Sequence, residues 1–302
     1  MFKNFFEAEE RLLQLPEKKR IGVVAAGDRH TLGAVAVAVK EELIEAVLLG
    51  KKKEILSLLQ EFDCPASSIE IIDIEEPEDC AKQAAHLVRE GELDSLMKGK
   101  IETAILMRVL LNQETGIRKN SIMSQVTFAD SPYYHKVFSS TDGALTPYPT
   151  LEQKLLIVNN AVEAHHALGQ EMPKVAILTA VEQVNPKMIE TVDAAALKES
   201  WQKGEISKCL LEGPISYDLA MQKEALSIKG FNSPVAGDAD ILVVPSVVAG
   251  NLLIKALAYT GGVELAGVTV GGMVPLIMTS RSSPERDKYM SIIFSSLIGK
   301  AG

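Results

Sequence analysis

A serine, an arginine and an aspartate lie within eight residues near the C-terminal end of the chain: Ser280, Arg281 and Asp287, in the run TSRSSPERD. Ser283 and Pro284 between them predict the start of a helix, as its N-cap and first helical residue. The first amides of a helix lack intrahelical partners and its dipole adds positive potential, so anions bind there. A hydroxyl, a guanidinium and a carboxylate at such a place indicate a reaction on a phosphate group. The alternative, a solvated loop with a helix cap, explains only Ser283 and Pro284.

A second basic group follows an apolar segment at 93–97. Lys98 and Lys100 stand where this predicted strand turns into a helix, a position that suits a phosphate or carboxylate ligand. The alternative is a pair of solvated lysines. Arg108 lies farther along, in the apolar helical run ILMRVLL. An arginine among core residues needs a partner, so Arg108 is a further candidate for binding an anion.

Two more strand exits carry polar residues in the second half of the chain. Asn185 follows a predicted strand at 174–179, and Asp218 follows one at 210–215. Ligand contacts are expected at the carboxyl ends of such strands. The alternative is a role in turns, because the Asn-Pro and Gly-Pro dipeptides of these loops favour them.

A small-residue loop precedes the most apolar helix of the chain. In GDADILVVPSVVAGN, a buried strand at 241–244 ends at a proline, and a helix is predicted to begin with Ala249, Gly250 and Asn251. We expect the Gly250 amide and Asn251 to hold an anionic or carbonyl oxygen at this helix start.

Short apolar strands alternate with helices along the first third of the chain, which predicts an α/β fold with parallel-rich sheets flanked by helices. The predicted strands are 21–26, 46–50, 69–74 and 93–97, with helices at 52–62 and 77–90. An irregular stretch at 131–149 marks the entrance to a second domain. That domain carries helices at 154–168 and 191–204 and the strands named above, followed by a strand at 267–270.

Composition limits the classes of protein that remain. The 302 residues predict two domains, and a net charge of -9 argues against nucleic-acid binding. Three widely spaced cysteines fit a reducing compartment. The N-terminal run MFKNFFEAEERLL is too charged for a signal peptide, and polar residues interrupt the apolar region 241–263, so no membrane span is expected. The predicted location is the cytoplasm.

Several familiar catalytic motifs are missing from the sequence. No G-x-G-x-x-G follows a strand, and neither G-x4-G-K-[ST] nor G-x-S-x-G occurs. The histidines offer no metal constellation; His165 and His166 are adjacent and point to different parts of a helix surface. The three cysteines are expected to be structural, so no covalent enzyme intermediate and no metal are predicted.

The dispersed motifs together resemble the phosphate acetyl/butyryltransferase family, and more closely its phosphate butyryltransferase branch. The matching text is LMKG at 96–99, AVEQVNPKM at 180–188, EGPISYDLA at 212–220, GDADILVVPSVVAGN at 237–251 and the Ser-Arg pair with its aspartate. The resemblance implies a two-domain fold like that of isocitrate and isopropylmalate dehydrogenases, with a cleft between the domains. It also implies that the C-terminal segment returns to the first domain. The expected domains are 1–130 with 280–302, and 131–279.

The reaction implied by this resemblance is acyl-CoA + phosphate ⇌ acyl phosphate + CoA, by direct attack of the CoA thiolate in a ternary complex. CoA would be a substrate, with no tightly bound cofactor. Asp287 is the expected general base, and Ser280 and Arg281 complete the catalytic group. Substrate binding is expected from Lys98, Gly99, Arg108, Asn185, Asp218, Gly250 and Asn251. The resemblance also implies a homodimer.

Two departures from the acetyltransferase branch suit a butyryl or branched acyl substrate, of which butyryl is favoured. Ala258-Tyr259 stands where that branch has an arginine, and Ser246 stands where it commonly has an aspartate. A phosphate acetyltransferase with the same mechanism is the first alternative. A non-catalytic protein that binds acyl-CoA or a phosphate ligand is the second, and it would have no use for Asp287. A dehydrogenase would need acidic metal ligands, whereas Asp238 and Asp240 are predicted at the wrong end of a strand.

Overall fold

The computed structural model describes residues 1–120, 122–280 and 283–299, and the chain divides into two compact units. The flanking unit comprises 5–121 and 266–302, and the central unit comprises 1–4 and 122–265. The sequence placed the two boundaries later, after residues 130 and 279. The difference arises from strand pairing: β5 (Ser124–Asp130) pairs with β6 (Phe138–Thr141) of the central unit, and β11 (Leu276–Ile277) pairs with β4 (Ser95–Lys98) of the flanking unit.

The flanking unit is built on strands in the order β3-β2-β1-β4-β11-β10. Neighbouring strands from β3 to β11 are parallel, and β10 is antiparallel to β11. The bounds of the remaining strands are Lys19–Val24 for β1, Ile44–Gly50 for β2, Glu70–Asp73 for β3 and Glu264–Val270 for β10. Parallel strands buried by helices on both faces explain why the sequence shows nearly continuous apolar runs here.

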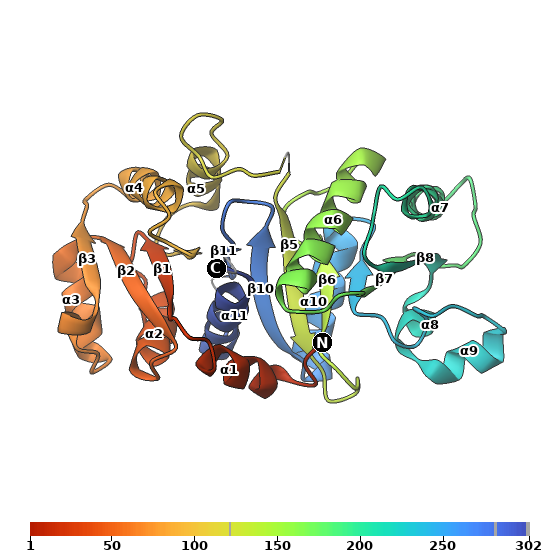
Figure 1. The fold of residues 1–302 in the computed structure, drawn as a ribbon, viewed down its shortest axis with the longest axis horizontal. Coiled ribbons are helices and arrows are strands. Elements are labelled where there is room, and N and C mark those ends of the chain that lie inside the picture. Colours follow the sequence, from red (N-terminus) through yellow and green to blue (C-terminus); the bar gives the residue numbers. More distant parts are fainter. Residues whose placement is uncertain (121, 281–282, 300–302) are drawn as a thin grey trace. The chain divides into compact units, whose positions relative to one another are not determined.

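Helices cover both faces of this sheet (Figure 1). The helices α2 and α3 connect β1 to β2 to β3, whereas α4 carries the chain back past β1 to β4. The sheet order therefore changes direction between β1 and β4, and in open α/β sheets ligands bind outside the carboxyl ends of the strands at such a switch point. The helices of this unit are α1 (Phe5–Leu13), α2 (Arg29–Lys40), α3 (Lys52–Glu61), the short η1 (Ala66–Ser68), α4 (Pro77–Arg89), α5 (Thr103–Leu110) and α11 (Glu285–Ile298).

The central unit has strands in the order β5-β6-β9-β7-β8, parallel except for the antiparallel pair β5 and β6. The strands β7, β8 and β9 span Lys174–Leu178, Leu210–Ile215 and Ile241–Val243. The helices are α6 (Leu151–Ala167), α7 (Ile189–Gln202), α8 (Tyr217–Met221), α9 (Lys223–Lys229) and α10 (Val247–Gly261). The two units together confirm the predicted α/β class.

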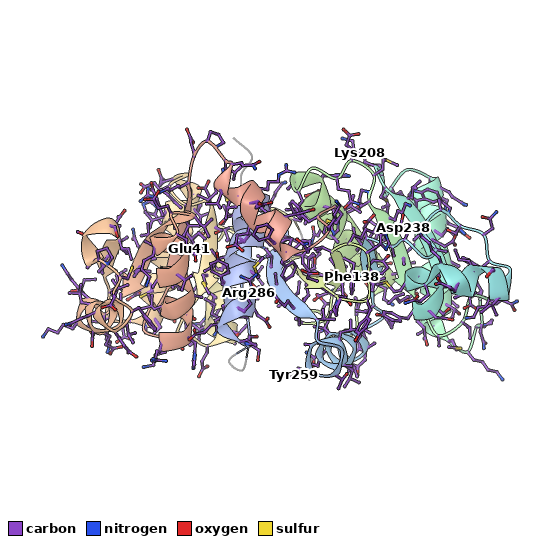
Figure 2. The ribbon with its side chains drawn as sticks, turned by 90° about the horizontal axis from the view of Figure 1, so that it is seen from below. Glu41, Phe138, Lys208, Asp238, Tyr259 and Arg286 are labelled. Atoms are coloured by element: carbon purple, nitrogen blue, oxygen red, sulfur yellow. The ribbon has the colours of Figure 1, made fainter. Side chains whose placement is uncertain are left out.

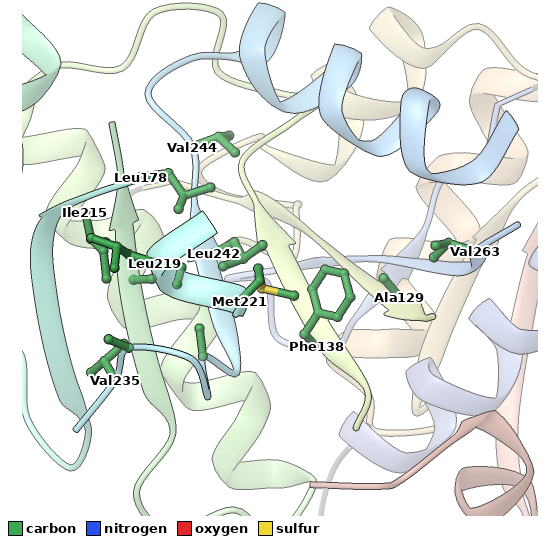
Figure 3. Packing of buried hydrophobic residues seen from close by; sticks show 14 residues of the cluster. Ala129, Phe138, Leu178, Ile215, Leu219, Met221, Val235, Leu242, Val244 and Val263 are labelled. Atoms are coloured by element: carbon green, nitrogen blue, oxygen red, sulfur yellow. The ribbon is translucent and has the colours of Figure 1, made fainter. Parts of the chain in front are cut away.

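The core of the central unit gathers side chains from strands and loops that are distant in sequence. Phe138, Leu242, Met221 and Val244 belong to one cluster of buried apolar residues, which Figure 3 shows from close by. Because Val244 directly follows β9, this packing fixes the strand exit that leads into α10.

Two predicted helix starts differ from the structure. The last helix begins at Glu285 with Pro284 at the N-cap position, so the assignment of Ser283 as N-cap was wrong. The apolar helix α10 begins at Val247, two residues before the predicted start, because the Ser246 hydroxyl caps it by accepting from the Ala249 amide at 3.4 Å.

Candidate functional site

A buried lysine lies at the start of α11, among charged groups of the flanking unit. Lys288 is 3 % exposed, and its Nζ donates to Thr279 Oγ1 at 2.8 Å and to the Ser280 carbonyl at 3.1 Å. Burial lowers the pKa of this ammonium; Asp28 and Asp287 act against that shift, and the positive charge of Lys98 adds to it. An ammonium with few protein partners and little water around it is suited to attract an anion.

These charged groups come from three neighbouring strand exits. Asp28 follows β1, Lys98 ends β4, and Asp287 and Lys288 lie in the first turn of α11, which follows β11. The strands β1, β4 and β11 are adjacent in the sheet. The group therefore lies at the switch point of the flanking sheet, where a ligand site is expected.

The sequence did not single out Asp28, although it caps α2. Its carboxylate accepts from the Thr31 amide at 2.8 Å and from the Thr31 hydroxyl. Burial raises the pKa of Asp28, but these two bonds and the charges of Lys288 and His30 outweigh burial and lower it overall. The aspartate is therefore a fixed negative charge beside Lys288. Its signal in the sequence was an Asp followed three residues later by Thr, directly after a strand.

The structure describes two of the three residues of the predicted catalytic group. Ser280 is exposed, and its carbonyl is held by Lys288. Asp287 is half-buried in the first turn of α11, where the helix dipole favours a carboxylate. Arg281 lies outside the described residues. The roles of all three stay predictions.

Glycine is required where β4 ends. The Gly99 amide donates to the Val24 carbonyl at 2.9 Å, and a Cβ on Gly99 would stand 2.4 Å from the Ala25 carbonyl oxygen. No residue with a side chain fits so close to the backbone that follows β1. Gly99 thus ties the exit of β4 to that of β1 and fixes where the half-buried Lys98 lies.

Arg108 has a partner, but it does not lie among core residues. Its side chain is 65 % exposed and pairs with Glu78 of α4 at 2.7 Å. The apolar positions around it in α5, Leu106 and Val109, are buried instead. Residues one or two positions apart on a helix point in different directions. Arg108 therefore has apolar neighbours in the sequence but does not share their buried side of the helix. Its proposed contact with phosphate stays a prediction.

In the central unit, a buried carboxylate shapes the loop after β6. Asp142 Oδ1 accepts from the Gln125, Ala144 and Leu145 amides at 3.3, 3.0 and 3.0 Å, and Oδ2 accepts from Thr146 at 3.1 Å. Burial raises the pKa of Asp142, and the four backbone bonds act against that shift. Asp142 falls in the irregular stretch at 131–149, which gave no sign in the sequence that this carboxylate would organise the loop.

This loop packs directly on the first turns of α10. A Cβ on Gly250 would stand 2.8 Å from the Gly143 Cα and 2.7 Å from a methyl group of Val244. The Gly250 amide donates to the Ser246 carbonyl at 3.0 Å, as the helix requires. It is therefore paired within the helix, and its expected contact with a substrate oxygen stays a prediction. Gly250 also permits close approach of the loop, while Asn251 beside it is exposed.

The exits of β7 and β8 form a polar cluster around Lys229. Its Nζ contacts Glu182 at 2.9 Å, Asp218 at 3.0 Å and the Ser216 hydroxyl at 3.2 Å. Hydrogen bonds from Ser216 and Lys229 lower the pKa of Asp218 to about 2. Asn185 in the neighbouring loop accepts the Lys187 amide at 3.0 Å, a turn-forming contact. The two predicted substrate ligands thus have structural partners.

The three cysteines and His165 fit structural roles. Cys64, Cys80 and Cys209 are buried and unbridged, and burial raises the pKa of each thiol, in Cys209 to about 11. His165 is fully buried between Ser139 and Gln170, and its pKa is lowered by burial to about 4. A protonated thiol is a weak nucleophile, so these cysteines do not favour covalent catalysis.

Asp238 and Asp240, which precede β9, form ion pairs with lysines. Asp238 contacts Lys174 and Lys136, and Asp240 contacts Lys136 at 2.6 Å. Over the part of the chain that the structure describes, no three His, Cys, Asp or Glu side chains are placed to share a metal ion. None of the helices traced in that same part is both long and apolar enough to cross a bilayer.

Residues 75–295, which include most of the elements described above, match the family model for phosphate acetyl/butaryl transferases. The chain belongs to this family. It is 37 % identical over 298 residues to a phosphate butyryltransferase of Clostridium beijerinckii, covering 99 % of this chain and 98 % of the relative. It is 38 % identical over 290 residues to a phosphate acetyltransferase of Thermotoga maritima, covering 95 % and 98 %.

A solved branched-chain phosphotransacylase from Enterococcus faecalis has the same fold, with a TM-score of 0.83 at 30 % identity over 93 % of this chain and 98 % of the other. The chain is therefore a phosphate acyltransferase of the acetyl/butyryl family, which uses CoA as a substrate. Identities of 37 % and 38 % to the two kinds of transferase do not separate butyryl from acetyl substrates.

Proposed function

We propose that this phosphate acyltransferase catalyses butyryl-CoA + phosphate ⇌ butyryl phosphate + CoA. The observation that carries this proposal is the group formed by Lys98, Ser280, Asp287 and Lys288 at the switch point of the flanking sheet. It combines a carboxylate that can accept a proton with two ammonium groups that can attract phosphate. No step in the reaction needs an enzyme nucleophile.

In the direction of acyl-CoA synthesis, the CoA thiol loses its proton to the Asp287 carboxylate. The thiolate sulfur attacks the carbonyl carbon of the acyl phosphate, and a new S–C bond forms. The bond between that carbon and the phosphate oxygen then breaks, and phosphate leaves with the electron pair. A positioned general base contributes about 10²- to 10⁴-fold to such a step.

The neighbouring groups stabilise charge that appears during the transfer. The Ser280 hydroxyl donates to the carbonyl or phosphate oxygen, a contact whose loss costs on the order of 10²-fold or more. Arg281 and Arg108 bind phosphate oxygens and Lys98 adds positive charge. Lys288 holds the Ser280 carbonyl and so positions the loop that carries this hydroxyl. Asn251, Asn185 and Asp218 of the central unit remain proposed substrate contacts.

Three residues in or next to α10 support the butyryl preference. Ser246 caps the helix, so the aspartate of the acetyltransferase branch is replaced by a neutral side chain with a structural role. Ala258 and Tyr259 offer no positive charge in the last turns of the helix. An apolar site distinguishes each methylene by about 1–3 kcal/mol, so butyryl should be preferred without complete exclusion of acetyl.

The test is phosphate-dependent release of CoA from butyryl-CoA, followed with a thiol reagent, with acetyl-CoA measured beside it. We expect release that requires phosphate and a higher kcat/KM for butyryl-CoA. A higher kcat/KM for acetyl-CoA would favour the alternative, a phosphate acetyltransferase with the same chemistry. Absence of release from both thioesters would leave the binding-protein hypothesis and remove the roles of Ser280 and Asp287.

We infer a cytoplasmic homodimer in which α10 contacts its copy. Gly250 is the only buried residue of α10, all of whose residues are described, while Leu252 and Tyr259 are 65 % and 69 % exposed. Figure 2 shows Tyr259 at the surface. Lys255 is the one charged residue of this apolar helix, so pairing of two copies meets little charge repulsion. Three unbridged cysteines support a reducing compartment.

Light scattering coupled to gel filtration should give twice the mass of 32.7 kDa for the wild-type chain. Leu252→Glu should shift the protein to the monomer mass, because it places a charge at the contact. Lys53→Glu, at an exposed position of α3, is the matched control and should remain dimeric. A wild-type monomer, or a dimeric Leu252→Glu variant, would contradict this interface.

A further inference from the structure

A cavity of about 230 Å³ lies within the flanking unit, at the carboxyl ends of its parallel strands. Its wall includes Gly27 after β1, Lys51 after β2, Ile74 after β3 and Lys100 after β4. These four strands are neighbours in the order β3-β2-β1-β4. The cavity therefore occupies the edge of the sheet where α/β folds bind ligands. None of the residues with a role in the proposed reaction lines this cavity.

The lining of the cavity combines an apolar surface with both kinds of charge. Ile74 and the buried Cys80 form part of the apolar surface. Glu54 Oε2 lies against the backbone after β1, only 3.0 Å from where a Cβ on Gly27 would stand. Lys51 and Lys100 add ammonium groups, and both side chains are exposed. Glu75 and Glu76 also line the cavity, and Lys51 pairs with Glu75 at 3.4 Å, so an incoming phosphate competes with that carboxylate for Lys51. An occupant with a flat apolar body, an amino group and nearby phosphates would satisfy all three features.

The volume of the cavity limits what it can hold. Pockets that enclose a whole drug-sized ligand measure roughly 300–1,000 Å³. A cavity of about 230 Å³ suits a single ring system and leaves the rest of a larger molecule outside. A nucleobase fits this description, because its faces are apolar and its edge carries hydrogen-bond donors that a carboxylate accepts.

The cavity and the charged group at the switch point both receive residues from the exit of β4. Lys100 lines the cavity. Lys98, two residues earlier, contributes positive charge that helps to lower the pKa of Lys288. The backbone between them is fixed, since the Gly99 and Lys100 amides donate to the Val24 and Ala25 carbonyls at 2.9 and 2.8 Å. One extended substrate can therefore contact both sides of Gly99.

We propose that this cavity binds the adenine ring of CoA. The Glu54 carboxylate accepts a hydrogen bond from the exocyclic amine, and Lys51 and Lys100 face the phosphates of the nucleotide. This inference rests on the proposed function, because it assigns a place to one end of the substrate used there.

The test compares a full substrate with one that lacks the nucleotide. Ile74→Trp fills the cavity and Glu54→Gln removes the acceptor charge, while Glu92→Gln is the matched control at an exposed position outside the cavity. KM and kcat are measured with butyryl-CoA and with butyryl-pantetheine, and thermal unfolding checks the fold of each variant. Binding of adenosine 3′,5′-bisphosphate, the nucleotide end of CoA, is measured separately by calorimetry.

We expect Ile74→Trp to raise KM for butyryl-CoA by about tenfold or more, as for the loss of one buried group. Its kcat/KM for butyryl-pantetheine should stay within about twofold of wild type, and its binding of the bisphosphate should be lost. Glu54→Gln should weaken both nucleotide measurements and Glu92→Gln neither. Wild-type bisphosphate affinity in Ile74→Trp, or equal loss with both thioesters, would overturn the proposal. If wild type turns over neither thioester, the proposed function fails, and the calorimetry still decides the cavity.

Discussion

Asp287→Asn should lower kcat for phosphate-dependent CoA release about 10²- to 10⁴-fold, the usual contribution of a general base. The amide keeps the size of the side chain and its place in the first turn of α11, but it cannot accept the thiol proton. The fold should survive, because the side chain is only half-buried and the backbone carbonyl of residue 287 still accepts from Ser291 at 2.6 Å.

Glu285→Gln is the matched control for this change. Glu285 is an exposed carboxylate in the same helical turn, so its loss removes the same charge without removing the proposed base. Its kcat should stay within about threefold of wild type, since surface charge at a helix start contributes only about 0.3–1 kcal/mol. Near-normal turnover in Asp287→Asn, or equal losses in both variants, would exclude Asp287 as the base.

Lys288→Met should lower kcat/KM roughly 10²-fold, because the Ser280 carbonyl loses a donor that helps to fix its position and keeps the Ser283 amide at 3.1 Å. Stability should change little, since methionine fills a similar volume and removes the cost of burying a charge. Lys288→Arg keeps a permanent charge and should retain more activity than Lys288→Met. Circular dichroism and thermal unfolding establish that both variants are folded.

The pH profile separates this role from a purely structural one. Burial lowers the pKa of Lys288 below the usual 10.5, so the wild-type enzyme should lose kcat/KM as the pH rises through that lowered value. Arginine remains protonated there, and Lys288→Arg should lack this alkaline decline. Folding responds in the opposite direction: the cost of burying the charge is fully present below the lowered pKa of Lys288 and diminishes as the pH rises from there toward 10.5. An identical decline in both proteins would contradict the assignment.

The sequence predicted the fold class well because its strands are short, apolar and separated by helices. It did not predict β11, which has only the residues Leu276 and Ile277 and no periodic pattern. That strand decides the later domain boundary, since it adds to the edge of β4. Pairing between residues far apart in sequence leaves no local signal, and so the division at residue 265 could not be predicted.

The candidate site was predicted in part. The group around Ser280 and Asp287 was found from residue types at a helix start, but Lys288 beside them was not considered. A lysine in the first turn of a helix usually extends into water, and only tertiary packing shows that this one is buried. At Gly250, folding adds a role that the sequence did not indicate: its amide is paired within α10, and its missing side chain is what the neighbouring loop requires.

The discontinuous flanking unit has a consequence for synthesis of the protein. While the chain is being made, β4 remains an unpaired sheet edge until β11 follows 178 residues later, counting from residue 98 to residue 276. Exposed edges of this kind can pair with other chains, so a nascent or truncated product should aggregate more readily than the complete protein. Asp287 and Lys288 are made later still. Activity should therefore appear only once residues 287 and 288 have been made, and not gradually as the chain lengthens.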